Sequence, residues 1–341
     1  MTHPSTASPR VRSIGLDAMR LVAAIFVIYI HLDVTEGALG NADFAIKTFC
    51  RWSVPAFFML SGYFIPSAGG LPRIDMRRLQ KVLVIIVTAN LLYLPLIPFV
   101  KADKSFPGVL VNGVWFHLWF LSALLFGLAA LKLAFAATRS RLIVAIVSLA
   151  ILAGYHWADW TNVTSGGGYD GTLKLFRFLQ AVPMLWLGWE LAQRGRGKGE
   201  TGLALILLAA GMMLCLAEIV WFTGSAGLPS TNAQFPLGVL PMTFGLFLLF
   251  RTGAADRLEG MAALGMRYSL LVYILHPLIL LALVRTLKRL HLGEAAVLGG
   301  EMLFAPVLAL VLAVAVARFV PPLAALLNGN LPFRRRPQAQ G

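Results

Sequence analysis

The chain consists of long runs of apolar residues separated by short segments that hold most of the polar residues. Runs of about 18 or more apolar residues have the length that crosses a lipid bilayer as an α-helix. A buried core would instead interrupt such runs with polar positions every second to fourth residue. The pattern therefore predicts an all-α fold, a polytopic membrane helix bundle of about ten transmembrane helices. The predicted spans are 14–32, 46–65, 79–99, 113–134, 141–156, 174–192, 202–222, 234–250, 266–284 and 297–325.

These spans form a single predicted membrane-embedded domain over residues 1–341, with short tails at 1–13 and 326–341. No internal repeat and no extra soluble domain is visible between them. The last span is long enough to tilt or to bend, and Pro306 offers a place for the bend.

The composition agrees with a membrane protein. Hydrophobic residues make up 58% of the chain and charged residues only 13%, whereas a soluble domain carries roughly a quarter charged residues. The net charge of +14 does not indicate a nucleic-acid partner, because the basic residues lie in short loops and not along one helix face. The two cysteines and the scattered histidines predict neither a disulfide framework nor a metal site.

The distribution of Lys and Arg predicts the orientation in the membrane. If the N-terminus is cytoplasmic, roughly two thirds of these residues fall in cytoplasmic segments, as the positive-inside rule requires. Both termini are therefore expected in the cytoplasm, with basic loops against the lipid surface. The cluster Arg285, Lys288 and Arg289 runs against this bias.

Three ionisable residues interrupt the first predicted span, namely Asp17, Arg20 and His31. Because each helical residue turns by about 100°, the three side chains project from one face, with Arg20 and His31 about 16 Å apart along the axis. An ionisable residue inside a membrane is a functional candidate by default. The alternative is an Asp17–Arg20 pair at the headgroup level, with His31 capping the span at the other interface.

Two further ionisable residues lie within predicted spans. Glu218 is at a depth similar to that of His31 and either orients it or pairs with another donor. His276 precedes Pro277, which favours a structural role in which the imidazole bonds a carbonyl freed by the proline.

Aromatic and small residues in other spans have structural interpretations. His117 lies near the outer interface, where Trp115 and Trp119 are typical of an aromatic belt. Ser61 and Gly62 permit close approach of two helices, and Ser61 is also a candidate supporting residue of the site.

The segment PRIDMRRLQK after the second span is rich in arginine. Such a loop either anchors the chain to anionic lipid or recognises the phosphates of a cytosolic ligand. The candidate donor-binding residues are Arg73, Arg77 and Arg78.

Five motifs, in order along the chain, resemble the acyltransferase-3 family of membrane acyltransferases. LDAMRLVAAIFVIYIHL resembles its first span, with an arginine and a histidine separated by ten residues, and FFMLSGYF followed by PRIDMRRLQK is similar to its second span and arginine-rich loop. WFLSALL, FRFLQAVPMLWLGWELA and GMRYSLLVYILHPLIL resemble later spans. One difference is Arg20-Leu21, where the family usually has Arg-Gly, and another is that the esterase-like domain of some members is not expected here.

The resemblance implies a multi-pass protein of the bacterial inner membrane that transfers an acetyl or other short acyl group. The donor would be cytosolic acyl-CoA, used as a co-substrate without a permanently bound cofactor, and the acceptor a hydroxyl of a cell-envelope polysaccharide or lipid-linked sugar. His31 would act as general base or form an acyl-histidine. Arg20 would hold donor or intermediate charge, and Asp17 would position Arg20.

Two other functions fit the same pattern. A transporter or flippase for a lipid-linked saccharide would line its pathway with the polar face of the first span, although no broken or inverted repeats are visible. A non-catalytic partner of a polysaccharide assembly machine is the third interpretation.

Overall fold

The computed structural model describes residues 13–32, 42–99, 106–166, 171–195, 197, 199–225, 233–252 and 257–331. These residues form α-helices joined by short connections, together with one hairpin of two short strands, β1 (Ser67–Ala68) and β2 (Leu71–Pro72). The helices are α1 (Ile14–Ile30), α2 (Ala42–Cys50), α3 (Ser53–Tyr63), α4 (Met76–Tyr93), α5 (Phe106–Asn112), α6 (Trp119–Ala137), α7 (Arg141–Thr164), α8 (Gly171–Leu179), α9 (Ala181–Gln193), α10 (Glu200–Val220), α11 (Val239–Arg251), α12 (Glu259–Arg289), α13 (Glu294–Phe319) and α14 (Pro321–Leu327).

The helices confirm an all-α membrane protein. Among the described residues, six helical segments are long and apolar enough to cross a bilayer. They also expose large apolar side chains, such as Leu149 on α7, Met213 on α10 and Leu303 on α13, as helices facing lipid do. The predicted total of about ten spans and the cytoplasmic termini stay predictions.

Two predicted spans are each built from a pair of shorter helices. The span 46–65 is divided between α2 and α3, which meet at Arg51, and the span 174–192 between α8 and α9, which meet at Gln180. Average hydropathy does not reveal such a division, because apolar residues predominate on both sides of the junction. Both junction residues line a cavity described below.

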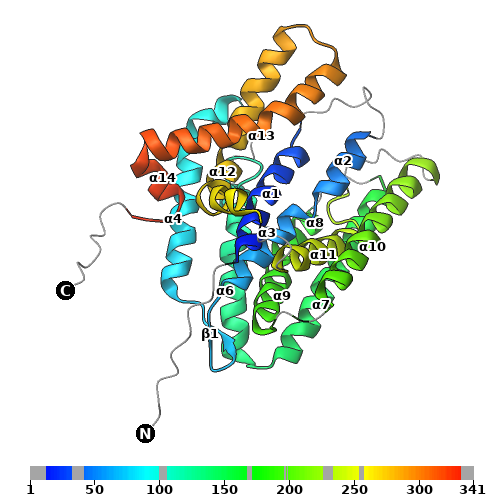
Figure 1. Ribbon diagram of the computed structural model, residues 1–341. Coiled ribbons are helices and arrows are strands. Elements are labelled where there is room, and N and C mark those ends of the chain that lie inside the picture. Colours follow the sequence, from blue (N-terminus) through cyan, green and yellow to red (C-terminus); the bar gives the residue numbers. More distant parts are fainter. Residues whose placement is uncertain are drawn as a thin grey trace, which may run out of the picture.

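Helix α1 lies near the middle of the molecule (Figure 1). It packs most extensively against α12 and also contacts α3 and α11. On one side α10 packs on α11, and on the other α13 is followed by α14, which contacts α4 (Figure 1). The polar residues of α1 are thus enclosed by neighbouring helices and do not face lipid.

Glycine allows α3 and α9 to approach closely. A Cβ atom at Gly62 would lie 2.0 Å from the carbonyl oxygen of Leu185, and one at Gly188 would lie 2.0 Å from that of Met59. The backbones of the two helices are therefore in direct contact, which confirms the packing role predicted for Gly62.

The C-terminal region differs from the expected single long span. Helix α13 continues through Pro306, where a bend stays a prediction, and the helical stretch is interrupted at Val320, before α14 begins with Pro321. Residues 326–331 are not part of a free tail, since Leu327 is fully buried and Gly329 packs on the backbone of Lys81. A proline early in a helix is well tolerated, because its missing N–H has no partner there anyway, so Pro321 suits the start of a new helix.

Candidate functional site

Two cavities lie at opposite ends of α1, one beside Arg20 and one beside His31. The Arg20 cavity has a volume of about 350 Å³ and the His31 cavity about 250 Å³. Polar residues around the first are Arg20, Ser61, Arg78, Ser269, Tyr273 and Asn328. Polar residues around the second are His31, Arg51, His117, Tyr155, Arg177, Gln180, Gln234 and Tyr273.

An aromatic partition separates the two cavities. Phe120 from α6 and Tyr273 from α12 line both cavities, and Phe57 from α3 packs against both rings. The Phe120 and Tyr273 ring centres are 5.3 Å apart, and those of Phe57 lie 6.0 and 6.3 Å from them. We call Phe57, Phe120 and Tyr273 the aromatic partition.

At the Arg20 cavity, Asp17 and Arg20 form the ion pair that their spacing predicts. Arg20 Nη1 lies 3.1 Å from Asp17 Oδ1, and the guanidinium carbon lies 4.6 Å from the centre of the Phe64 ring. Asp17 is almost fully buried, whereas Arg20 keeps part of its side chain in the cavity. Asp17 therefore holds Arg20 against the cavity wall and does not itself line the cavity.

The arginine-rich segment reaches the same cavity through one residue. Arg78 lines the cavity and donates a hydrogen bond to the carbonyl oxygen of Phe64 at 2.9 Å. Arg73 and Arg77 are exposed on the surface, where Arg73 pairs with Asp75 at 3.1 Å. Helix α4 begins at Met76, so Arg77 and Arg78 belong to its first turn and not to the preceding loop.

Ser61 also reaches the Arg20 cavity, but its hydroxyl donates to the Phe57 carbonyl oxygen at 2.8 Å within the same helix. From the C-terminal end of the described chain, Asn328 adds its amide to the cavity wall. The amide group donates to the Ala324 carbonyl oxygen at 2.8 Å, which fixes its orientation.

At the other end of α1, three imidazoles gather. The His31 ring lies 5.5 Å from that of His276 with the planes nearly parallel, and the His276 and His117 rings are 5.2 Å apart. Within the part of the chain that the structure describes, the His31 side chain has no hydrogen-bond partner, so its nitrogens face the cavity uncommitted. No group of three or more His, Cys, Asp or Glu side chains in the same described residues is arranged to hold a metal ion.

His276 has the structural role predicted from Pro277. Proline lacks an N–H, so Pro277 leaves the carbonyl oxygen of Tyr273, four residues earlier, without its helical partner. His276 Nδ1 lies 2.7 Å from this oxygen and, because a carbonyl can only accept, carries the proton. In the neutral ring Nε2 is then a lone-pair acceptor, and this buried atom has no hydrogen-bond partner among the described residues.

His117 is fixed in the wall of the His31 cavity in a similar way. His117 Nε2 donates to the Ile274 carbonyl oxygen at 3.2 Å, and its own carbonyl accepts from the hydroxyl of Tyr273. The aromatic belt predicted around it is wrong, because Trp115 and Trp119 are 4% and 8% exposed and face the interior. Hydropathy places such residues at membrane depth but does not say which face of the segment they occupy.

Glu218 pairs with a donor other than His31, which is the second of its two predicted roles. Its Oε2 accepts from the backbone N–H of Leu237 at 2.8 Å, and it interacts electrostatically with His156 and Asp159. It does not line the His31 cavity. The carboxylate thereby anchors the segment before α11 and has no contact with His31.

Four charged or amide residues of the His31 cavity were not predicted from the sequence: Arg51, Arg177, Gln180 and Gln234. They come from three separate segments, so no single local motif unites all four. Each also lies at a helix end or between helices, where a polar residue is ordinary. The one available signal is that Arg51 and Gln180 interrupt apolar runs at the junctions of paired helices.

Taken together, the fold and the cavities define a helical membrane protein with two neighbouring cavities that an aromatic partition separates. The family model of an acyltransferase domain, Acyl_transf_3, matches residues 13–321. The chain therefore belongs to this family of membrane acyltransferases, as the motifs of its spans predict.

Partial similarity also extends to two enterococcal proteins. A serine/alanine racemase of Enterococcus gallinarum is 30% identical over 127 residues, which are 33% of this chain and 18% of that protein. An amino-acid racemase of Enterococcus faecalis is 27% identical over 169 residues, which are 45% of this chain and 24% of that protein. The chain thus matches less than a quarter of either relative. No solved structure is significantly similar to the chain.

Proposed function

We propose that the chain is an O-acyltransferase of the bacterial inner membrane, which moves an acetyl or other short acyl group from cytosolic acyl-CoA to a hydroxyl of a cell-envelope polysaccharide or lipid-linked sugar. The observation that carries the proposal is the pair of cavities at opposite ends of α1, which share Phe120 and Tyr273 as a common wall. Such an arrangement suits a reaction in which donor and acceptor arrive from opposite sides of the membrane.

The Arg20 cavity is the proposed donor site. Its cationic groups, Arg20 and Arg78, lie toward the side that the Lys and Arg distribution assigns to the cytoplasm, where acyl-CoA is found. Guanidinium groups suit phosphate oxygens, so Arg78 and the exposed Arg73 and Arg77 would hold the nucleotide end of the donor. The thin pantetheine arm would then lie in the cavity with the thioester at the aromatic partition.

His31 is the proposed catalytic residue. An imidazole with uncommitted nitrogens, facing a cavity, can take the proton of an acceptor hydroxyl as this oxygen attacks the thioester carbonyl. The acceptor oxygen forms an ester bond with the acyl carbon, the carbon–sulfur bond breaks, and the proton passes through His31 to the departing CoA thiolate. A route through an acyl-histidine uses the same residue.

Arg20 is assigned to the donor and not to the reacting atoms. It lies about 16 Å from His31 along the helix axis, which is beyond hydrogen-bond reach of an oxyanion formed beside His31. Asp17, paired with Arg20 at 3.1 Å, acts as the positioning residue.

Purified protein in lipid nanodiscs tests the proposal. With labelled acetyl-CoA and an extract of cell-envelope glycans, we expect release of CoA and label in the glycan fraction. His31→Ala should lower the rate about a hundredfold or more, the usual contribution of a general base, while the exposed His291→Ala should leave it unchanged. Full activity of His31→Ala would refute the assignment, and absence of any acetyl-CoA consumption by folded protein would refute acyl transfer.

A transporter or flippase is the second candidate, because two cavities divided by a partition also suit alternate opening toward the two sides. The same assay separates the two functions, since transport of a saccharide consumes no acyl-CoA. Racemase activity is not proposed, because the match covers only 18% and 24% of the two racemases.

A further inference from the structure

The imidazole of His31 can act as a general base only if its ring is oriented. A base presents a lone pair to the proton that it removes, and in the neutral imidazole the other ring nitrogen then carries a hydrogen. A hydrogen bond from this N–H selects one of the two tautomers and fixes the ring. The group that receives the bond should therefore lie beside His31, away from the substrate.

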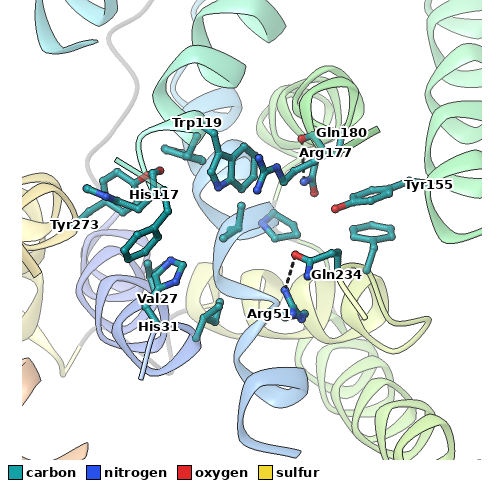
Figure 2. Close-up of a pocket in the computed structure, with 16 residues that line it drawn as sticks. Val27, His31, Arg51, His117, Trp119, Tyr155, Arg177, Gln180, Gln234 and Tyr273 are labelled. Atoms are coloured by element: carbon teal, nitrogen blue, oxygen red, sulfur yellow. Dashed lines mark hydrogen bonds between the residues drawn. The ribbon is translucent and has the colours of Figure 1, made fainter. Parts of the chain in front are cut away.

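His276 lies in this place. Its ring centre is 5.5 Å from that of His31, and the two ring planes are inclined by only 15°. Of the titratable groups around His31, His276 has the strongest electrostatic effect on it. His276 is fully buried and does not itself line the His31 cavity, so it stands on the protein side of His31. In Figure 2, His31 lies with His117 and Tyr273 at one side of the cavity, away from Tyr155 and Gln234 in this view.

Pro277 sets the chemical form that His276 presents to His31. The proline leaves the Tyr273 carbonyl oxygen without its helical donor, and His276 Nδ1–H fills this place at 2.7 Å. The proton of the neutral ring is thereby held on Nδ1, so Nε2 carries a lone pair. This buried nitrogen has no hydrogen-bond partner among the described residues, and an N–H from a neighbour would stabilise it.

His117 presents a similar lone pair at Nδ1, because its Nε2 donates to the Ile274 carbonyl oxygen. Its ring packs on His276, with the centres 5.2 Å apart and the planes inclined by 74°. Within the part of the chain that the structure describes, no ring contact joins His117 to His31. His276 is therefore the better placed of the two imidazoles to receive the His31 N–H.

We propose that His276 is a positioning residue for His31, whose ring N–H donates to His276 Nε2 and whose other nitrogen then directs its lone pair into the cavity. In the structure these two side chains form no direct hydrogen bond, which requires the nitrogens to be about 3 Å apart. A small rotation of the His31 ring forms it, and hydrogen bonds of catalytic groups often tighten only when substrate binds.

The proton of the acceptor hydroxyl passes to the free His31 nitrogen, and the resulting imidazolium keeps its other N–H on His276 Nε2. His276 retains its own proton on Nδ1 throughout, and His31 returns the proton that it took to the CoA thiolate. This inference rests on the proposed function and adds a residue to the same reaction.

Two substitutions separate the positioning role from the structural role of His276. His276→Asn keeps an amide N–H near the Tyr273 carbonyl oxygen but has no atom at the place of Nε2, whereas His276→Gln reaches that place with its amide oxygen. We expect His276→Asn to melt close to the wild-type temperature and to lower kcat about tenfold, as loss of one hydrogen bond does, with the KM for acetyl-CoA unchanged. His276→Gln should melt at a lower temperature and yet retain more of the wild-type kcat.

Nitrogen-15 NMR of the full chain in nanodiscs, with labelled histidine and bound CoA, gives a readout that does not depend on turnover. The His31 signals are those that disappear in His31→Ala. We expect a single tautomer of His31 in the wild-type protein and a mixture of both tautomers in His276→Asn.

A wild-type kcat in His276→Asn, a folded His276→Gln that is no more active than His276→Asn, or the same His31 tautomers in the wild-type protein and in His276→Asn would overturn the inference. Failure of the proposed function gives a different result. In that case the wild-type protein consumes no acetyl-CoA, while the tautomer of His31 still depends on His276.

Discussion

The ion pair between Asp17 and Arg20 has a matched counterpart on the surface. Both this pair and Arg73–Asp75 have a nitrogen–oxygen distance of 3.1 Å, but the first pair has side chains 27% and 5% exposed, and the second 63% and 54%. At this distance the Coulomb attraction is about 1 kcal/mol in water and about 5 kcal/mol at an effective dielectric constant near 20. At equal distance, the greater burial of the Asp17–Arg20 pair is therefore what makes its expected attraction stronger than that of the Arg73–Asp75 pair.

We expect Asp17→Asn to lower the free energy of unfolding by about 2–3 kcal/mol, because it leaves a largely enclosed guanidinium without its counter-charge. This value is below the range for fully buried pairs because Arg20 retains contact with the cavity. Asp75→Asn should change the free energy of unfolding by less than about 1 kcal/mol, as is usual for exposed pairs. On the proposed function, Asp17→Asn should also raise the KM for acyl-CoA more than it lowers kcat, because Arg20 loses its position at the proposed donor site.

Thermal unfolding in detergent measures the loss of stability, since the melting temperature of a chain of this size falls by about 2 °C per kcal/mol. Steady-state kinetics with varied acetyl-CoA measure the change in KM. A double-mutant cycle with Arg20→Gln isolates the coupling between the two side chains. Equal shifts in melting temperature for Asp17→Asn and Asp75→Asn, or additive effects in the cycle, would refute the reasoning.

Two further predictions concern the contact between α3 and α9 and the aromatic partition. Gly62→Ala should destabilise the protein by about 1–3 kcal/mol or more, because the new methyl group meets the Leu185 carbonyl oxygen. Gly202→Ala, which has open space around it, should not destabilise the protein, and equal melting temperatures of the two variants would contradict this reasoning. Phe120→Ala should open the aromatic partition and increase acceptor-independent release of CoA from acetyl-CoA. Phe126→Ala, on the exposed face of the same helix, is the control, and an unchanged rate of CoA release in Phe120→Ala would contradict a separating role for the ring.

The sequence predicts the features that depend on local order. The helical rotation of about 100° per residue predicts that Asp17, Arg20 and His31 point into the protein. In the structure Asp17 is buried, and Arg20 and His31 line the two cavities, although His31 is the residue that caps the end of α1. The role of His276 follows in the same way from the missing N–H of Pro277, because the partner carbonyl is only a turn away.

Features that depend on contacts between distant segments could not be predicted. The shared face of Arg20 and His31 gives no sign that Phe120 and Tyr273 divide it into two cavities, because these rings come from α6 and α12. Arg177 is likewise an ordinary loop-side cation in the sequence. Only the approach of Trp119 and Asn112 turns it into a fixed part of a cavity wall.

The aromatic partition has a consequence for the cell as well as for the reaction. A protein with openings toward both faces of an energised membrane risks becoming a leak for protons and other ions. On the proposed function, in which the two cavities face opposite sides of the membrane, the rings of Phe57, Phe120 and Tyr273 stand between them, and these groups cannot replace the hydration shell of an ion. On the proposed function, an uncharged acyl group passes this barrier while the ion gradient across the membrane is kept.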